Sequence, residues 1–171
     1  MATATTVTAQ STVSGTDDTS AGEAQIIRPE VRTTLVTGTA TEVTVQAGAH
    51  RFTIDEPAGL GGTDKGANPV EHLLGALGAC QVITFQVWAD KLGIAVEEID
   101  IALTGELDLR GFFGIDPDVR PGFSSIDVAV QLTGPETAER YQELVDAVER
   151  HCPVLDGLGN TVPVRVTYAT V

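Results

Sequence analysis

The sequence predicts an α+β fold, with short strands grouped on either side of one long helix in the order βββαββαβ. Six segments alternate between apolar and polar residues and are rich in β-branched side chains. They are residues 31–37, 41–47 and 51–55 before the helix, and residues 95–109, 123–133 and 162–171 after it. Segment 69–92 instead carries apolar residues around almost its whole circumference, which predicts a helix buried on all sides.

The central helix has clear signals at both ends. Asn68 is a good N-cap, Pro69 suits the first helical position, and Glu71 completes a capping box three residues after the cap. Gly93 is a typical helix stop. A helix of this length spans roughly 36 Å, which a chain this small cannot easily cover alone.

A second copy of the chain is the natural cover for this helix. Gly75, Ala76, Gly78 and Ala79 are small, so another backbone can approach the helix closely there. We therefore expect an obligate homodimer. The alternative is a monomer in which two sheets or helices of the same chain cover the helix.

The remaining segments have simpler signals. Gly38 and Gly48 are suited to hairpin turns, and residues 110–117 form a turn-rich, aromatic loop. Residues 135–150 have the pattern of an amphipathic helix. Cys152-Pro153 is the signal for the start of another helix. The aromatic residues are expected to pack in the core or in a dimer interface, or else to line an apolar pocket.

The composition sets the class of protein. The 171 residues predict one domain over residues 26–171, preceded by a Thr/Ala/Ser-rich tail over residues 1–25 that is expected to be disordered and to be no targeting signal. A net charge of −14 argues against nucleic acid and anionic membranes, which require a basic surface. No uninterrupted apolar run reaches about 18 residues, so no membrane span is expected. Two cysteines are too few for a secreted disulfide scaffold, which favours the cytoplasm.

Cys80 and Cys152 are the leading candidates for chemistry. Cys152 precedes Pro153 and is expected at a helix N-cap, where exposed amides stabilise a thiolate. Cys80 is in the middle of its helix and would need a nearby cation. The alternative is that both are packing residues, since free cysteine is commonly buried. Glu71 has two interpretations as well: it completes the capping box, or it orients a cation beside the thiol.

The three histidines do not predict a metal site or a Cys-His hydrolase. His50, His72 and His151 occur without the spacing of a metal-binding motif. His151 adjoins Cys152, but neighbours on one element point apart. We therefore expect neither a metal nor a cofactor.

Together these motifs resemble those of the OsmC/Ohr family, within its OsmC-like branch, over residues 31–171. The resemblance rests on two sequence motifs together, on the distance between them in the sequence, and on the βββαββαβ order of elements in which they occur. The two motifs are Asn68-Pro69-Val70-Glu71 followed by Gly78-Ala79-Cys80, and His151-Cys152-Pro153-Val154.

The resemblance implies a thiol-dependent peroxidase that reduces organic hydroperoxides in oxidative-stress defence. In the family, the cysteine matching Cys80 attacks the peroxide and becomes a sulfenic acid, and the cysteine matching Cys152 resolves it as a disulfide. A dithiol, of the lipoyl type in some members, then reduces the disulfide. The family also implies an intertwined homodimer, in which two sheets wrap a pair of central helices and the active sites lie at the subunit interface.

Two positions depart from the organic-hydroperoxide branch of the family. The glutamate that directly follows the proline there is Val70 here, with Glu71 one position later. The activating arginine of that branch has no counterpart in the first turn, which leaves Arg110 as the first candidate and Arg32 and Arg51 as the others. The alternative function is a non-catalytic dimer that binds a small apolar ligand at its interface.

Overall fold

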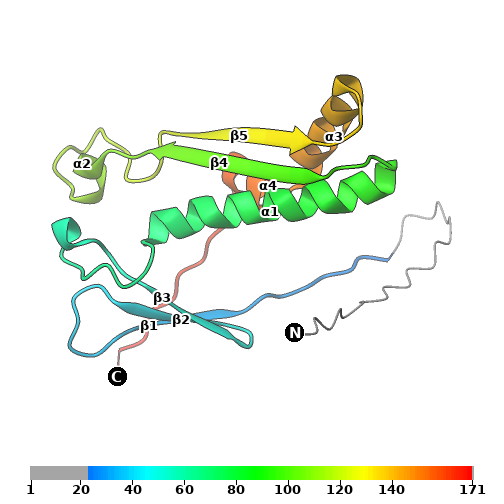
Figure 1. Cartoon of the computed structure of the whole chain (residues 1–171). Coiled ribbons are helices and arrows are strands. Elements are labelled where there is room, and N and C mark those ends of the chain that lie inside the picture. Colours follow the sequence, from blue (N-terminus) through cyan, green and yellow to red (C-terminus); the bar gives the residue numbers. More distant parts are fainter. Residues whose placement is uncertain (1–22, 171) are drawn as a thin grey trace, which may run out of the picture.

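The fold is organised around a single long helix, α1 (Pro69–Leu92), that lies between two antiparallel sheets (Figure 1). The computed structural model describes residues 23–170. Asn68 caps α1, and Gly93 ends it in the left-handed conformation with φ of 62°. These ends confirm the predicted helix.

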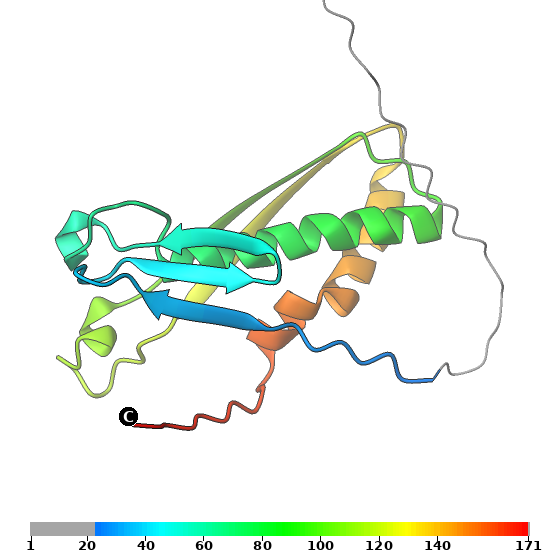
Figure 2. The same cartoon turned by 90° about the horizontal axis from the view of Figure 1, so that it is seen from below.

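The first sheet precedes α1 in the sequence and has the order β1-β2-β3. Its strands are β1 (Val31–Leu35), β2 (Val43–Ala47) and β3 (His50–Ile54). Val45 is buried and pairs with Phe52, whose ring lies 5.2 Å from that of His72 on α1. The apolar face of this sheet is therefore turned toward the first turns of α1. Figure 2 shows the sheet lying across the N-terminal half of the helix.

The second sheet is a long hairpin on the other side of α1. It consists of β4 (Glu98–Glu106) and β5 (Ser125–Thr133), paired from Glu98↔Thr133 to Glu106↔Ser125. Gly78 of α1 approaches β4 so closely that a Cβ atom there would lie 2.8 Å from Leu103 Cδ1. The small residue thus permits close packing of α1 on this sheet.

Two further helices complete the core. They are α3 (Ala138–His151) and α4 (Pro153–Gly159). Arg140 donates to the Leu92 carbonyl oxygen at 2.8 Å, and Tyr141 donates to that of Ala95 at 3.0 Å, which fixes α3 against the end of α1. The buried cluster comes from α1, α3 and the residues beside them, and it is made of Leu77, Phe85, Ala89, Ile94, Leu144, Val148 and Cys152.

The structure differs from the expected strand order at the C-terminus. Residues 161–170 are exposed and form no strand, and Val171 lies outside the described residues. A strand requires a partner for its N–H and C=O groups, and segment 161–170 pairs with no strand among residues 23–170. The loop after β4 also contains a short helix that the sequence did not predict, α2 (Leu109–Phe112). Most of the expected tail, residues 1–22, lies outside the described part of the chain.

One chain covers α1 only in part, as expected of a chain too small to cover so long a helix alone, and its burial on all sides by a second copy stays a prediction. Leu73, Ala76, Ile83 and Val87 form an exposed stripe with helical spacing, and the Ile83 side chain is 64% exposed. The helix is also long and apolar enough to cross a membrane by length and composition, with a mean hydropathy of 1.2 over 18 residues. Its position between two sheets, with its other face buried, is that of a core helix.

Candidate functional site

The two cysteines meet where α1 passes the junction of α3 and α4. Cys80 is half-buried on α1, and Cys152 is fully buried at the N-cap of α4, although 72 positions separate them in the sequence. Cys80 packs against the buried cluster that contains Cys152, and it lies near enough to the Cys152 thiol to affect its pKa. The packing of the helices therefore brings the two cysteines into one neighbourhood.

The environment of Cys152 keeps its thiol protonated. Burial raises the pKa of the Cys152 thiol, and the adjacent Cys80 raises it further, whereas the backbone amides of Leu155 and Val154 lower it. The predicted N-cap position is confirmed, but the expected stabilisation of a thiolate there is outweighed by burial. Cys152 is thus poorly suited to be the first nucleophile.

Cys80 lies at the border between the core and the exposed stripe of α1. It packs against the buried cluster and shares a helix face with Ala76 and Ile83. Thr84 donates to the Cys80 carbonyl oxygen at 2.7 Å, and the next residue, Gln81, is buried with its side-chain oxygen unpaired. A reactant would therefore reach Cys80 from the stripe.

Glu71 is occupied at the start of α1. Its carboxylate accepts from the Asn68 N–H at 2.8 Å, and the Asn68 side chain accepts from the Glu71 N–H at 2.9 Å. Nine positions of helix separate Glu71 from Cys80, or roughly 14 Å along the axis. The structure thus brings Glu71 to the capping box and not to the thiols of its own chain.

Arg110 is engaged within its own loop. Its guanidinium pairs with Asp108 and with Asp116, the latter at 3.3 Å. Asp108 raises the pKa of Arg110, first by hydrogen bonding and then by its charge. Among residues 23–170, no arginine donates a hydrogen bond to either sulfur atom.

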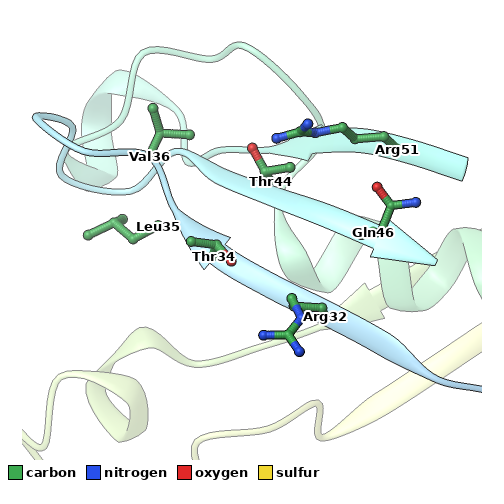
Figure 3. Close-up of a pocket in the computed structure, with 7 residues that line it drawn as sticks. All are labelled: Arg32, Thr34, Leu35, Val36, Thr44, Gln46 and Arg51. Carbon is green, nitrogen blue, oxygen red and sulfur yellow. The ribbon is translucent and has the colours of Figure 1, made fainter. Parts of the chain in front are cut away.

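The other two candidate arginines lie on the polar face of the first sheet. Arg32, Gln46 and Arg51 are aligned across β1, β2 and β3 by the strand register. Figure 3 shows these side chains along a shallow cavity of about 470 Å³ that Thr34 and Thr44 also line. This face is opposite to the one turned toward α1, so neither guanidinium reaches Cys80 within the chain.

The histidines have structural surroundings. The His151 ring lies 4.0 Å from that of Trp88, and its Nδ1 atom is 2.7 Å from the Ala147 carbonyl oxygen. His72 lies against Phe52, and His50 belongs to β3. The described residues contain no group of three His, Cys, Asp or Glu side chains arranged to hold a metal ion.

Sequence reasoning found both cysteines but missed what surrounds them. The amides of Val154 and Leu155 near the Cys152 sulfur follow from the Cys152-Pro153 start of α4, which was visible in the sequence. The burial of Cys152 and its proximity to Cys80 had no local signal, because both depend on how α3 and α4 pack on α1.

Several solved structures have a fold similar to that of this chain. An OsmC-like protein from Mycoplasma pneumoniae superposes with a TM-score of 0.67 at 22% identity, covering 78% of this chain and 88% of that one. An organic hydroperoxide resistance protein OsmC from Legionella pneumophila gives 0.59 at 18% identity, covering 79% and 91%. An organic hydroperoxide resistance protein from Elizabethkingia anophelis gives 0.59 at 20% identity, covering 77% and 88%.

The family assignment comes from the sequence itself. A search among curated proteins finds no match. The family model described as OsmC-like protein matches residues 62–167, which include α1, both cysteines and the second sheet. The chain therefore belongs to the OsmC-like protein family.

Proposed function

We propose that this protein is a thiol-dependent peroxidase that reduces organic hydroperoxides, with Cys80 as the attacking and Cys152 as the resolving cysteine. One observation carries the proposal: the only two cysteines of the chain are neighbours where α1 packs against the start of α4. Two solved structures of similar fold are named for organic hydroperoxide resistance, which supports the same class of substrate.

The proposed reaction uses the two thiols in turn. The Cys80 thiolate attacks the terminal peroxide oxygen, the O–O bond breaks, and the alkoxide takes a proton and leaves as an alcohol. Cys80 is then a sulfenic acid, and the Cys152 sulfur displaces its hydroxyl group as water, which forms the disulfide. A dithiol reduces this disulfide by exchange and becomes oxidised itself.

The two environments support this division of roles. The raised pKa of Cys152 keeps it protonated while Cys80 reacts. Cys80 is the sulfur beside the exposed stripe, and Cys152 is fully buried. A resolving cysteine needs contact with the sulfenic acid more than contact with the substrate.

We also propose that the working form is a homodimer. The stripe formed by Leu73, Ala76, Ile83 and Val87 leaves an apolar helix face open beside Cys80. Val162, Val164 and Val166 alternate along the exposed C-terminal segment, as expected of a strand whose partner belongs to another chain. A second copy would cover both, and it would bring one of Arg32, Arg51 and Arg110 to the Cys80 thiolate.

The two free cysteines also bear on the cellular compartment, the reductant and the rival function. Two free thiols are stable in a reducing compartment, so we propose a cytoplasmic enzyme with a small dithiol, of the lipoyl type, as reductant. The rival function, a non-catalytic binding protein, would not need the cysteines to be neighbours. Their position as neighbours therefore favours the peroxidase.

The decisive experiment is peroxide consumption by the full chain. Cumene hydroperoxide would be supplied with dihydrolipoamide, and the wild type compared with Cys80→Ser and Cys152→Ser. We expect turnover by the wild type, and at least a hundredfold loss for Cys80→Ser because the remaining thiol, Cys152, is buried and has a raised pKa. Equal rates for the wild type and Cys80→Ser would reject the proposal.

A further inference from the structure

A second candidate site lies between β5 and α4, where the structure contains a cavity of about 330 Å³. This volume is at the lower end of the range for small-molecule sites. Neither cysteine lines the cavity. Its apolar walls come from α1, β5, α4 and the loop before β5, and they consist of Leu77, Phe123, Ile126, Val128, Leu155 and Leu158.

The walls of the cavity are fixed by the fold. Leu77 is fully buried, and Leu155 packs against the buried cluster. The Phe123 ring rests on Gly105 of β4, where a Cβ atom would lie only 2.4 Å from the ring. These contacts hold the apolar lining in place without a ligand.

The mouth of the cavity is polar and cationic. Arg120, Ser124 and Ser125 line it beside the apolar residues. The Arg120 backbone lies against Gly111, where a Cβ atom would be 2.5 Å from the Arg120 carbonyl oxygen. The guanidinium extends over Gly122, with Nη2 3.5 Å from the position of a Cβ atom there. The glycine at position 111 therefore allows the close approach of the Arg120 backbone, and the Arg120 side chain passes Gly122 at ordinary contact distance.

Arg120 also differs from its neighbour in charge pairing. Arg110, in the same loop, is held by Asp108 and Asp116. Arg120 makes no ion pair with any residue in the described part of the chain. Other arginines of the described chain, such as Arg150, are also unpaired, but Arg120 is the basic residue that lines this cavity, and its planar set of donors is free for an anion.

We propose that this cavity binds a medium-chain carboxylate, with the alkyl chain between β5 and α4 and the carboxylate on the Arg120 guanidinium. Arginine suits a carboxylate because two parallel N–H donors match its two oxygen atoms. Since neither thiol lines the cavity, the site is independent of the proposed peroxidase reaction, although Leu155 belongs to both surroundings.

Calorimetric titration of the full-length protein tests this site. The probes are decanoate below its micelle concentration, decanol with the same chain and no charge, and acetate with the charge and no chain. We expect decanoate to bind at least tenfold more tightly than either of the others. Arg120→Gln should weaken decanoate binding at least tenfold, and Arg120→Lys should restore part of the loss.

Two matched controls keep the result specific. Arg150→Gln removes the same charge from an exposed position on α3 outside the cavity, and it should leave the affinity unchanged. Leu158→Gln should weaken binding, whereas Ile27→Gln, at an exposed position outside the cavity, should not. Equal affinities of the wild type and Arg120→Gln, equal binding of decanol and decanoate, or no decanoate binding would each overturn the proposal. Peroxidase activity has no part in this readout, so the two proposals fail separately.

Discussion

The two sides of α1 differ in how completely one chain packs them. The closed half, made of β4, β5, α3, α4 and the covered face of α1, contains almost the entire buried cluster. The open half, made of the first sheet, the exposed stripe of α1 and residues 161–170, buries only Val45 and Asp55 fully. The closed half brings the thiols together, and the open half exposes the surface through which they would be reached.

This difference separates what one chain can do from what requires a second copy. The proximity of Cys80 and Cys152 needs only the closed half. A cation for the Cys80 thiolate and a cover for the stripe are missing from the described chain, and both would come from outside it. The following changes test the two halves separately.

The largest expected effect is in the closed half. Phe85 lies on α1, and its side chain is almost fully buried in the cluster. Phe85→Ala should lower the free energy of unfolding by about 3–5 kcal/mol, because it leaves a cavity as well as removing apolar burial. Urea denaturation measures this loss, with Ile27→Ala, exposed and outside the cluster, as the control that should change little.

In the open half, an exposed residue should have a large effect on assembly. Ile83→Glu places a charge in the centre of the stripe. We expect the dimer dissociation constant to rise at least about tenfold, since a charge cannot be buried there without a partner. Light scattering across a dilution series gives the mass, with Ile27→Glu as control. A monomeric wild type at all concentrations would contradict the proposed dimer.

The first sheet depends on one buried carboxylate. Asp55 accepts hydrogen bonds from Thr41, the Glu56 N–H and Thr63, which connect β3 to the loops around it. The Thr41 hydroxyl is the largest cause that holds the pKa of Asp55 well below its usual range, with burial opposing it. The carboxylate therefore stabilises the fold above the pKa of an unfolded aspartate, about 3.9, and this contribution is lost progressively as the pH falls below that value.

Asp55→Asn makes this dependence measurable. The difference in unfolding free energy between the wild type and Asp55→Asn should be greatest near pH 6 and should narrow between pH 4 and pH 3. Urea denaturation at each pH provides the values. Asp90→Asn, on the exposed face of α1, is the matched control and should show no such narrowing. If the difference in unfolding free energy between the wild type and Asp55→Asn does not change with pH, the ionised Asp55 carboxylate does not stabilise the fold.

The smallest expected effect concerns Glu71. If it is a capping residue, Glu71→Gln should leave the peroxidase rate within about twofold, because glutamine can still accept from the Asn68 N–H. Asn68→Ala, which removes the other half of the capping box, should cost about 1 kcal/mol of stability. A large loss of rate for Glu71→Gln, with stability unchanged, would place the carboxylate in the reaction.

The sequence was informative where signals are local. The capping box at Asn68, the stop at Gly93 and the alternating strands β1 to β5 all follow from residues close together in the chain, and they were predicted. The two cysteines were singled out as the only thiols of the chain, one in the central helix and one before a proline, and their role in a reaction stays a prediction.

The parts that were not predicted depend on distant contacts. The segment 162–171 has the pattern of a strand, yet it has no strand partner in the described chain. The raised pKa of Cys152 depends on burial by α1 and α3, which no local pattern reveals. Arg110 and Arg120 lie in one loop and differ only in their neighbours: the first is neutralised by two aspartates, and the second is free at a cavity.

The central claim is that Cys80 and Cys152 form one redox unit within each chain, and thiol mapping after oxidation tests it most directly. Reduced protein would receive one equivalent of cumene hydroperoxide per chain, followed by mass spectrometry of the non-reduced peptides. We predict loss of both free thiols and a peptide pair joined through Cys80 and Cys152, with Cys152→Ser stopping at a Cys80 sulfenic acid that dimedone traps. Two unreacted thiols in the wild type, or a sulfenic acid at Cys80 that persists with Cys152 still free, would contradict the account.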